Sequence, residues 1–183
     1  MDSSRYPWTI GLAAGIPMDL TIDGGSGQQT LTLSDLTLTA FTMDSGSGSV
    51  QATLPPGEYP LSFDMGSGSV TLILPGNSAF DLVLDTGSGS STLEVGEGTS
   101  LFAQVDSGSG SVNFNLPNDA AIRLELLDSG SGSLNVADNM VRVEDHGDGA
   151  GVWETPDFSE AAIQINLVIK DQGSGSINLR NNQ

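Results

Sequence analysis

The chain has 183 residues, enough for one domain or one repeat array with a real hydrophobic core. Its formal net charge is −18, with only five Lys and Arg residues, which disfavours binding to nucleic acid or to an anionic membrane surface. The absence of Cys excludes disulfides, thiolate nucleophiles and Cys-based zinc sites. Cations and basic protein surfaces are the partners that this charge favours.

The N-terminal residues precede a regular repeat. Residues 1–7 lack the charged and apolar order of a signal peptide, and no apolar run is long enough to span a bilayer, so we expect no direct membrane insertion. Trp8, Ile10 and Leu12 alternate as in a strand. We expect residues 1–15 to form a capping or contact strand, and residues 16–183 to form one repeat domain. The strand either covers the first open edge of that domain or, in the hypothesis that we adopt, contacts a neighbouring subunit.

The motif Asp-x-Gly-Ser-Gly occurs seven times. Successive copies are 20 to 22 residues apart, except for a last step of 43 residues, which is close to two periods. A fixed period of this size is typical of stacked repeat folds. The copies begin at Asp23, Asp44, Asp64, Asp85, Asp106, Asp128 and Asp171.

Alternating apolar residues flank each motif, which predicts one strand entering the Gly-Ser turn and a second strand leaving it. Corners rich in Pro, Gly and Asn separate the repeats, and no stretch has a helical period. Near the C-terminus the alternation is displaced by one residue, and we interpret Leu127, Glu144 and Lys170 as bulges. The side chains expected to point into the core include Phe63, Leu72, Leu82, Leu93 and Phe114.

Two architectures fit this pattern: a parallel β-solenoid with one repeat per coil, and an antiparallel meander in which each Gly-Ser turn closes a hairpin. We favour the solenoid because turns that stack on one another would have to stay alike, whereas hairpin tips in solvent would not. The expected fold is an all-β, single-stranded parallel β-solenoid with about 21 residues per coil and roughly eight coils. In this interpretation Asp145 begins a degenerate eighth repeat.

Stacked coils would place the repeat Asp side chains in a ladder, one strand spacing apart, where like charges repel. One interpretation is that each carboxylate accepts hydrogen bonds from its own Gly-Ser turn, as in an Asx-turn. The alternative is that divalent cations, Ca²⁺ above all, bind between carboxylates and turn carbonyls. The candidate metal ligands are Asp44, Asp64, Asp85, Asp106, Asp128, Asp145 and Asp148. No other cofactor is expected.

The chain shows no convincing catalytic motif. Asp85-Thr86-Gly87 resembles an aspartic protease motif, but such enzymes need two aspartates that share a proton, and here the segment is one copy of a repeat. A Ser nucleophile needs a base, and His146, the only His, lies in a Gly-rich acidic loop. We therefore expect no enzymatic activity and no catalytic residues.

Five segments carry a resemblance to a known family: residues 18–23, 25–27, 31–36, 151–158 and 173–177. They resemble the toast-rack type of bacterial adhesin-like β-solenoid, which includes the C-terminal part of LiaF-type cell-envelope stress proteins. The resemblance extends from about Pro7 to Arg180, although the middle residue of the turn is Ser here and often Ala in that family. It implies a β-solenoid without known catalysis, often associated with the cell envelope.

The expected function is therefore a non-catalytic structural or adhesion-like β-solenoid of the bacterial cell envelope that self-associates. The alternative is a LiaF-type sensory or regulatory module that docks on a membrane partner, although the membrane-spanning part of such proteins is absent from this sequence. The expected partner is the chain itself, as a homo-oligomer or filament, or another envelope protein. The expected location is the cell envelope or the extracellular space.

Overall fold

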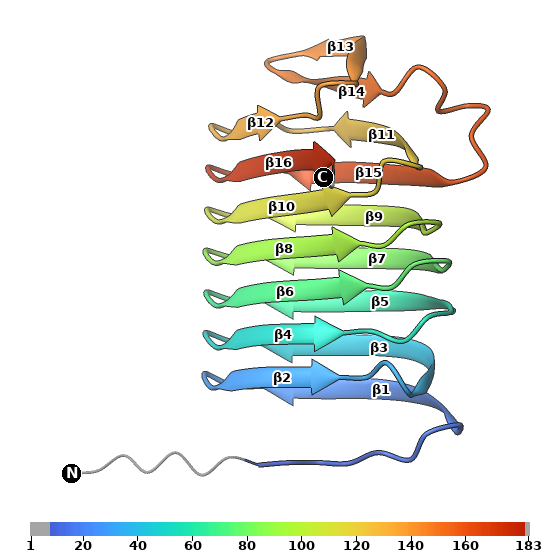
Figure 1. The fold of residues 1–183 in the computed structure, drawn as a ribbon. Coiled ribbons are helices and arrows are strands. Elements are labelled where there is room, and N and C mark those ends of the chain that lie inside the picture. The colour runs from blue at the N-terminus through green and yellow to red at the C-terminus, as the bar shows by residue number, and fades with distance from the viewer. Residues whose placement is uncertain (1–7, 182–183) are drawn as a thin grey trace.

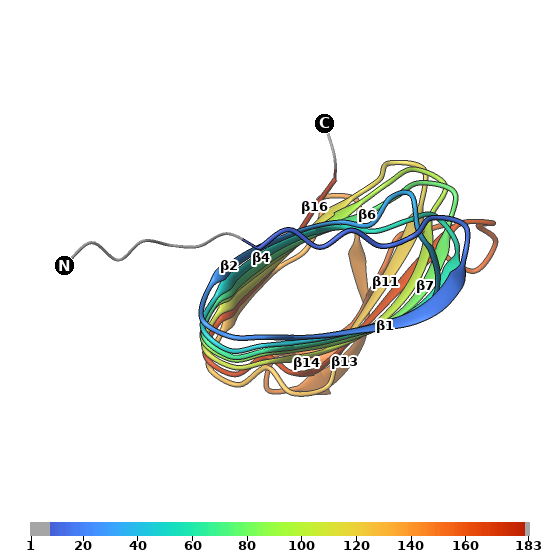
Figure 2. The same ribbon diagram turned by 90° about the horizontal axis from the view of Figure 1, so that it is seen from below.

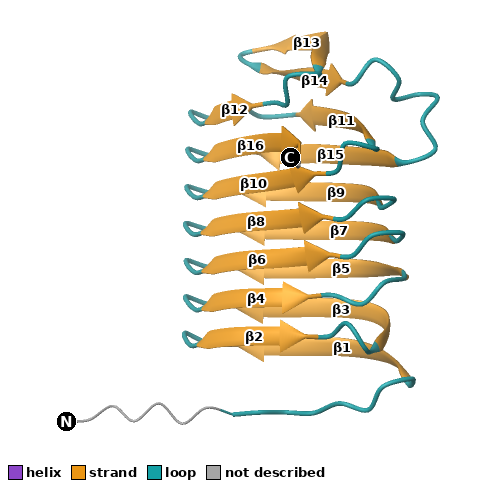
Figure 3. Cartoon of the chain, viewed as in Figure 1, coloured by secondary structure: helices purple, strands orange, loops and turns teal. Residues whose placement is uncertain are grey.

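The computed structural model describes residues 8–181, which form strands and loops and no helix (Figure 3). Two sheets face each other across one core, and each coil contributes one strand to each sheet (Figures 1 and 2). The nine-stranded sheet contains, in spatial order, β1 (Pro17–Gly24), β3 (Thr37–Ser45), β5 (Glu58–Met65), β7 (Ala79–Thr86), β9 (Ser100–Ser107), β15 (Gln164–Asp171), β11 (Ala121–Leu126), β14 (Ala150–Glu154) and β13 (Val141–Gly147). The seven-stranded sheet contains β12 (Ser133–Asn135), β16 (Ser176–Asn181), β10 (Ser111–Leu116), β8 (Ser90–Val95), β6 (Ser69–Leu74), β4 (Ser49–Thr53) and β2 (Gln28–Thr32).

Strands from successive coils pair in parallel and in equivalent positions. Asp44 pairs with Asp64, Asp64 with Asp85, and Asp85 with Asp106. The expected parallel β-solenoid with coils about 21 residues apart is thus confirmed. The antiparallel meander would have paired each strand with the strand across its own Gly-Ser turn.

The alternation of side chains has the expected register. Phe63, Leu72, Leu82, Leu93 and Phe114 each expose 1% of their surface or less. The residues between them on each strand point outward and are exposed or partly exposed. Because every coil adds inward-facing side chains from both of its strands, the core continues from coil to coil along the axis.

The repeated glycines are explained by how closely the turns stack. A Cβ on Gly68 would lie 1.7 Å from the carbonyl oxygen of Gly48, and a Cβ on Gly89 would lie 1.5 Å from that of Gly68. The turn amides also continue the ladder between coils, since Gly87 N–H donates to Met65 C=O at 2.8 Å and Ser88 N–H to Gly66 C=O at 3.1 Å. No residue with a side chain fits at these glycines without moving backbone.

The last coils do not follow the order of the sequence. The first five coils, β1–β2 to β9–β10, stack in chain order, but β15 lies between β9 and β11, and β16 lies between β10 and β12 (Figure 1). The chain therefore leaves the fifth coil, skips one position, and returns later to fill it. The expectation of roughly eight coils is wrong, because only seven pairs of strands stack in parallel within residues 8–181.

The expected eighth repeat at Asp145 is also wrong. Asp145 belongs to β13, which pairs antiparallel with β14, and β14 pairs antiparallel with β11. The chain reverses at Gly147, Asp148 and Gly149, which all have positive φ and so form a tight hairpin loop. The bulge expected at Lys170 is confirmed by a register shift between Ile169 and Asp171. The bulge expected at Glu144 is wrong by one residue, because Glu144 pairs with Val152 and the register shift leaves Val143 unpaired.

Candidate functional site

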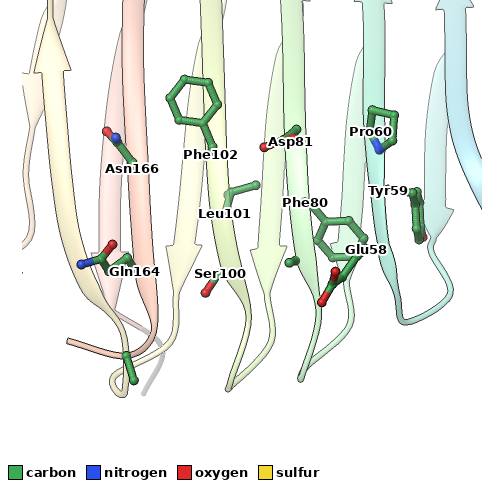
Figure 4. A pocket seen from close by; sticks show the side chains of 12 residues that line it. Glu58, Tyr59, Pro60, Phe80, Asp81, Ser100, Leu101, Phe102, Gln164 and Asn166 are labelled. Carbon is green, nitrogen blue, oxygen red and sulfur yellow. The ribbon is translucent and has the colours of Figure 1, made fainter.

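An open groove of about 570 Å³ lies on the outer face of the nine-stranded sheet (Figure 4). It is lined by Glu58 from β5, Asp81 from β7, Phe102 from β9, and Gln164 and Asn166 from β15. Phe102 is exposed, and the side-chain oxygen of Asn166 is buried without a hydrogen-bond partner. The groove lining contains no His, Lys or Arg, so it offers polar contacts and one exposed ring rather than a catalytic constellation.

The repeat aspartates form the expected ladder along the Gly-Ser edge. Asp23, Asp44, Asp64, Asp85 and Asp106 occupy equivalent positions of paired strands, all with exposed side chains. Asp171 continues the ladder beside Asp106. Asp128 follows, since Gln172 N–H donates to its carbonyl oxygen at 3.1 Å. Five of the seven candidate metal ligands, Asp44, Asp64, Asp85, Asp106 and Asp128, therefore lie in one row.

The hydrogen bonds of the ladder differ along its length. Asp128 accepts a bond from Gly130 N–H at 2.9 Å, and Asp171 accepts one from Gly173 N–H at 2.7 Å, as an Asx-turn requires. In the middle coils, by contrast, the amides of Gly87 and Gly108 donate to carbonyls of the preceding coil. The Asx-turn interpretation is thus confirmed at Asp128 and Asp171 and is wrong around Asp85 and Asp106, where stacking of the turns uses the amides.

Asp85 shows the electrostatic consequence of this stacking. Partial burial raises the pKa of its carboxyl group, and the negative charges of Asp106 and Asp64 raise the pKa further. The like charges on the two neighbouring coils therefore oppose ionisation of Asp85, and the ladder works against the folded state at neutral pH.

The remaining candidate metal ligands lie elsewhere. Asp145 and Asp148 belong to the β13–β14 hairpin, where the Asp145 carboxylate accepts a bond from Gly147 N–H at 2.9 Å and pairs with Arg142 at 2.7 Å. Within residues 8–181 no group of three or more His, Asp or Glu side chains is arranged to hold a metal ion. Binding of Ca²⁺ by the ladder stays a prediction.

The only His contacts a carboxylate. His146 lies in the hairpin, and its Nε2 contacts Glu144 at 3.2 Å. The loop of this hairpin lies against the Gly-Ser edge of the solenoid, where Ser129 Oγ donates to the carbonyl oxygen of Asp148. Thr86, which follows Asp85, points into the core with its hydroxyl buried. The described residues bring no Ser and His together at a common site.

A buried row of hydroxyl groups was not expected from the sequence. Ser45, Thr86 and Ser107 each follow a repeat Asp and point inward, and their side-chain oxygens have no hydrogen-bond partner. The alternation of side chains along the entering strand was sufficient to predict this row, because a residue next to an outward-facing Asp must face the core.

The two ends of the solenoid differ in structure. The β13–β14 hairpin extends the nine-stranded sheet beyond β11 at one end, whereas β1 and β2 at the other end have no strand beyond them (Figure 1). The expected N-terminal strand is absent from the described part, since Trp8 to Ala13 lie in no strand. In this arrangement, therefore, the segment does not cap the first coil. Apolar side chains remain exposed beside the bare end, with 90% of Trp8, 81% of Ile10 and 57% of Ile16 accessible.

The comparisons with known proteins concern the fold and the N-terminal part. A crystal structure of a "putative cell adhesion protein" from Clostridium sporogenes superposes with a TM-score of 0.49 and 11% sequence identity, over 92% of this chain and 94% of that one. No curated protein sequence matches the chain. The described residues include no helix long and apolar enough to cross a membrane. Residues 1–73 match the family described as the N-terminal domain of toast_rack, DUF2154.

Proposed function

We propose that this protein is a non-catalytic structural or adhesion-like β-solenoid of the bacterial cell envelope, and that it self-associates through its N-terminal end. The observation that carries the proposal is the difference between the two ends. The free edges of β1 and β2 present unpaired backbone groups, which template pairing with another chain. Long solenoids normally need a cap at each end, and the N-terminal end has none in the described residues.

The side chains at this end support the same conclusion. Met18, Leu20, Ile22 and Leu31 belong to the first coil and are only partly buried, whereas equivalent positions in later coils are buried completely. A second copy placed against this end would extend both sheets and cover the core. Self-association also suits a protein whose function is to present a long regular surface, such as the groove-bearing face, in many copies. We assign the protein no enzymatic role and no required cofactor.

The experiment is to measure mass by light scattering over a wide range of concentration, together with electron microscopy of the same samples. We expect mass to rise with concentration. The matched variants are Thr30→Pro and Thr30→Val. Leu33 N–H donates to β4. Because backbone N–H groups point to alternate sides along a strand, Thr30 N–H, three residues earlier, points to the free edge. Proline at position 30 therefore blocks edge pairing without removing a bond to β4.

Thr30→Pro should stay monomeric at concentrations where the wild type and Thr30→Val associate. A wild type that is monomeric throughout would contradict the proposal and favour the alternative, in which the same bare end docks on a membrane partner. Equal association of all three proteins would show that the contact lies elsewhere.

A further inference from the structure

The segment from Trp8 to Leu12 has the apolar spacing of one further strand next to β2. Trp8, Ile10 and Leu12 stand 21 residues before Gln29, Leu31 and Leu33, respectively. The latter three are the positions of β2 and its end that face the core, and Leu33 is 6% exposed. The N-terminal segment thus has apolar residues at each position that would face inward if it stacked on β2 in the usual register.

The corner that follows this segment is built like the corners of later coils. Met18, the first core-facing residue of β1, comes six positions after Leu12, and Leu101 comes six positions after Val95. The third residue after Leu12 is Gly15 with φ 75°, and the third residue after Val95 is Gly98 with φ 74°.

The same corner occurs once more, between Leu74 and Phe80, where the third residue is Asn77 with φ 56°. In the coils that contain Leu74 and Val95, this corner joins a strand of the seven-stranded sheet to a strand of the nine-stranded sheet. The corner at Gly15 therefore connects β1 to a position directly beyond β2.

The segment already runs in the direction that a strand beyond β2 would take. In Figure 1 it runs beneath the first coil in the same direction as β2, and in Figure 2 it crosses the N-terminal end on the side of β2. The exposed fraction falls from 90% at Trp8 to 46% at Leu12 as the chain approaches the corner. The segment forms no strand in this arrangement, so it is displaced from β2 and its apolar side chains face solvent.

We propose that residues Trp8–Leu12 are a strap that docks as a parallel strand on the free edge of β2 of its own chain, covers the open end of the core, and thereby competes with self-association. The structure shows the open arrangement, with edge and strap both free. Docking requires no new loop closure, because the corner at Gly15 is already formed. Regulation of assembly by the strap rests on the proposed function, whereas docking of the strap does not.

The test uses the absence of Cys from the chain. In the docked strap Ile10 lies beside Leu31 on the adjacent strand, within the Cα separation that a disulfide bridges. The double variant Ile10→Cys, Leu31→Cys should therefore form an intramolecular disulfide at low protein concentration. The matched control is Thr9→Cys, Leu31→Cys, in which the first thiol points away from the core and should not form the bond.

The oxidised Ile10→Cys, Leu31→Cys protein should need about a tenfold higher concentration to associate than its reduced form. Deletion of residues 1–13 should have the opposite effect and lower that concentration. A disulfide between chains, or association lost on deletion, would overturn the inference and show that the strap belongs to an intersubunit contact. Equal disulfide yields in the two Cys pairs would also overturn it. If the protein never associates, the proposed function fails, while the intramolecular disulfide still reports docking.

A second measurement avoids any change in the first coil. In a Trp153→Phe background Trp8 is the only tryptophan, so its fluorescence reports the strap directly. We expect emission from Trp8 to be shielded from acrylamide in monomeric protein and to become accessible in Thr30→Pro, where the edge cannot accept the strap. Full quenching in both proteins would overturn the inference.

Discussion

At the scale of single residues, the constraint that recurs most often is the close contact between stacked turns. The second glycine of every Gly-Ser-Gly turn except the first lies under a carbonyl of the neighbouring coil, so it must lack a Cβ. The serine between the glycines points to solvent in every middle coil, as Ser67 and Ser88 do. Within one motif, therefore, the glycines recur for a steric reason, whereas the serine between them does not.

Replacement of Gly89 by Ala should accordingly destabilise the fold. The new Cβ would stand 1.5 Å from the carbonyl oxygen of Gly68, so backbone must shift, at a cost of about 1–3 kcal/mol or more in the free energy of unfolding. Ser88→Ala, one residue away and exposed, should change that free energy by about 0.5 kcal/mol or less. Denaturant unfolding of both variants measures the difference, and similar values would contradict the stacked turn.

Replacement of Asp85 by Asn should stabilise the fold at neutral pH, by about 1 kcal/mol or less because the side chain is largely exposed. The pKa of Asp85 is raised in the folded state by burial and by Asp106 and Asp64, so ionisation costs stability as pH rises through that pKa. The advantage of the variant should shrink as pH falls toward the ordinary Asp pKa of about 3.9 and vanish well below it, where the wild-type carboxyl group is protonated in both states. Asp81→Asn, outside the ladder, is the control for thermal unfolding, and an advantage unaffected by pH would reject repulsion as its cause.

At the scale of elements, the two final coils depend on each other. β15 pairs with β9 on one side and with β11 on the other, and β16 likewise separates β10 from β12. The core side chains of this coil, including Ile165, Leu167, Ile169 and Ile177, have no exposed surface. Until this C-terminal coil is in place, β11 and β12 have no contact with the first five coils through either sheet.

Deletion of residues 164–183 should therefore unfold more than the deleted coil. We expect β11 to β14 to lose protection from amide hydrogen exchange, while β3 to β8 keep theirs, because solenoid coils are stabilised mainly by their nearest neighbours. The matched control is deletion of residues 1–13, which removes no described strand and should leave protection of β11 to β14 unchanged. Retained protection of β11 in the first deletion would mean that β11 can stack directly on β9.

At the scale of the whole molecule, charge is distributed unevenly along the axis. No Lys or Arg occurs between Pro7 and Ile122, so the first five coils contain acidic and no basic side chains. Of the five basic residues, Arg5 lies outside the described residues, and the C-terminal coils and hairpin contain the other four, Arg123, Arg142, Lys170 and Arg180. Contact between two N-terminal ends would bring like charges together. The proposed self-association is thus opposed by charge and driven by edge pairing and apolar burial.

Salt should consequently strengthen self-association. Raising ionic strength from about 0.01 M to 0.15 M shortens the Debye length from roughly 30 Å to 8 Å and weakens repulsion between the acidic ends. We expect the concentration at which mass rises in light scattering to fall over this range. A concentration that stays constant or rises with added salt would contradict repulsion between two acidic ends.

The local sequence determined the coil, its turns and its core. Alternation along each strand fixed which side chains face inward, so Phe63, Leu82 and Phe114 could be placed correctly without a structure. The identical turns indicated stacking, because only close packing of one turn on the next requires glycine at the same place in each. These features depend on residues within one period of each other, and the period-two pattern of a strand is sufficient to show them.

The order of the final coils was decided only by the tertiary structure. The repeats at Asp128 and Asp171 have the same motif and the same alternation, so either could stack on the coil of Asp106. Every coil presents the same row of backbone donors and acceptors, and local pattern therefore cannot select a neighbour. The choice depends on where the β13–β14 hairpin directs the chain, which is a contact between distant segments. The sequence also predicted a strand around Trp8, whereas residues 8–13 lie in no strand, because pairing with an edge depends on the assembled end and not on the segment itself.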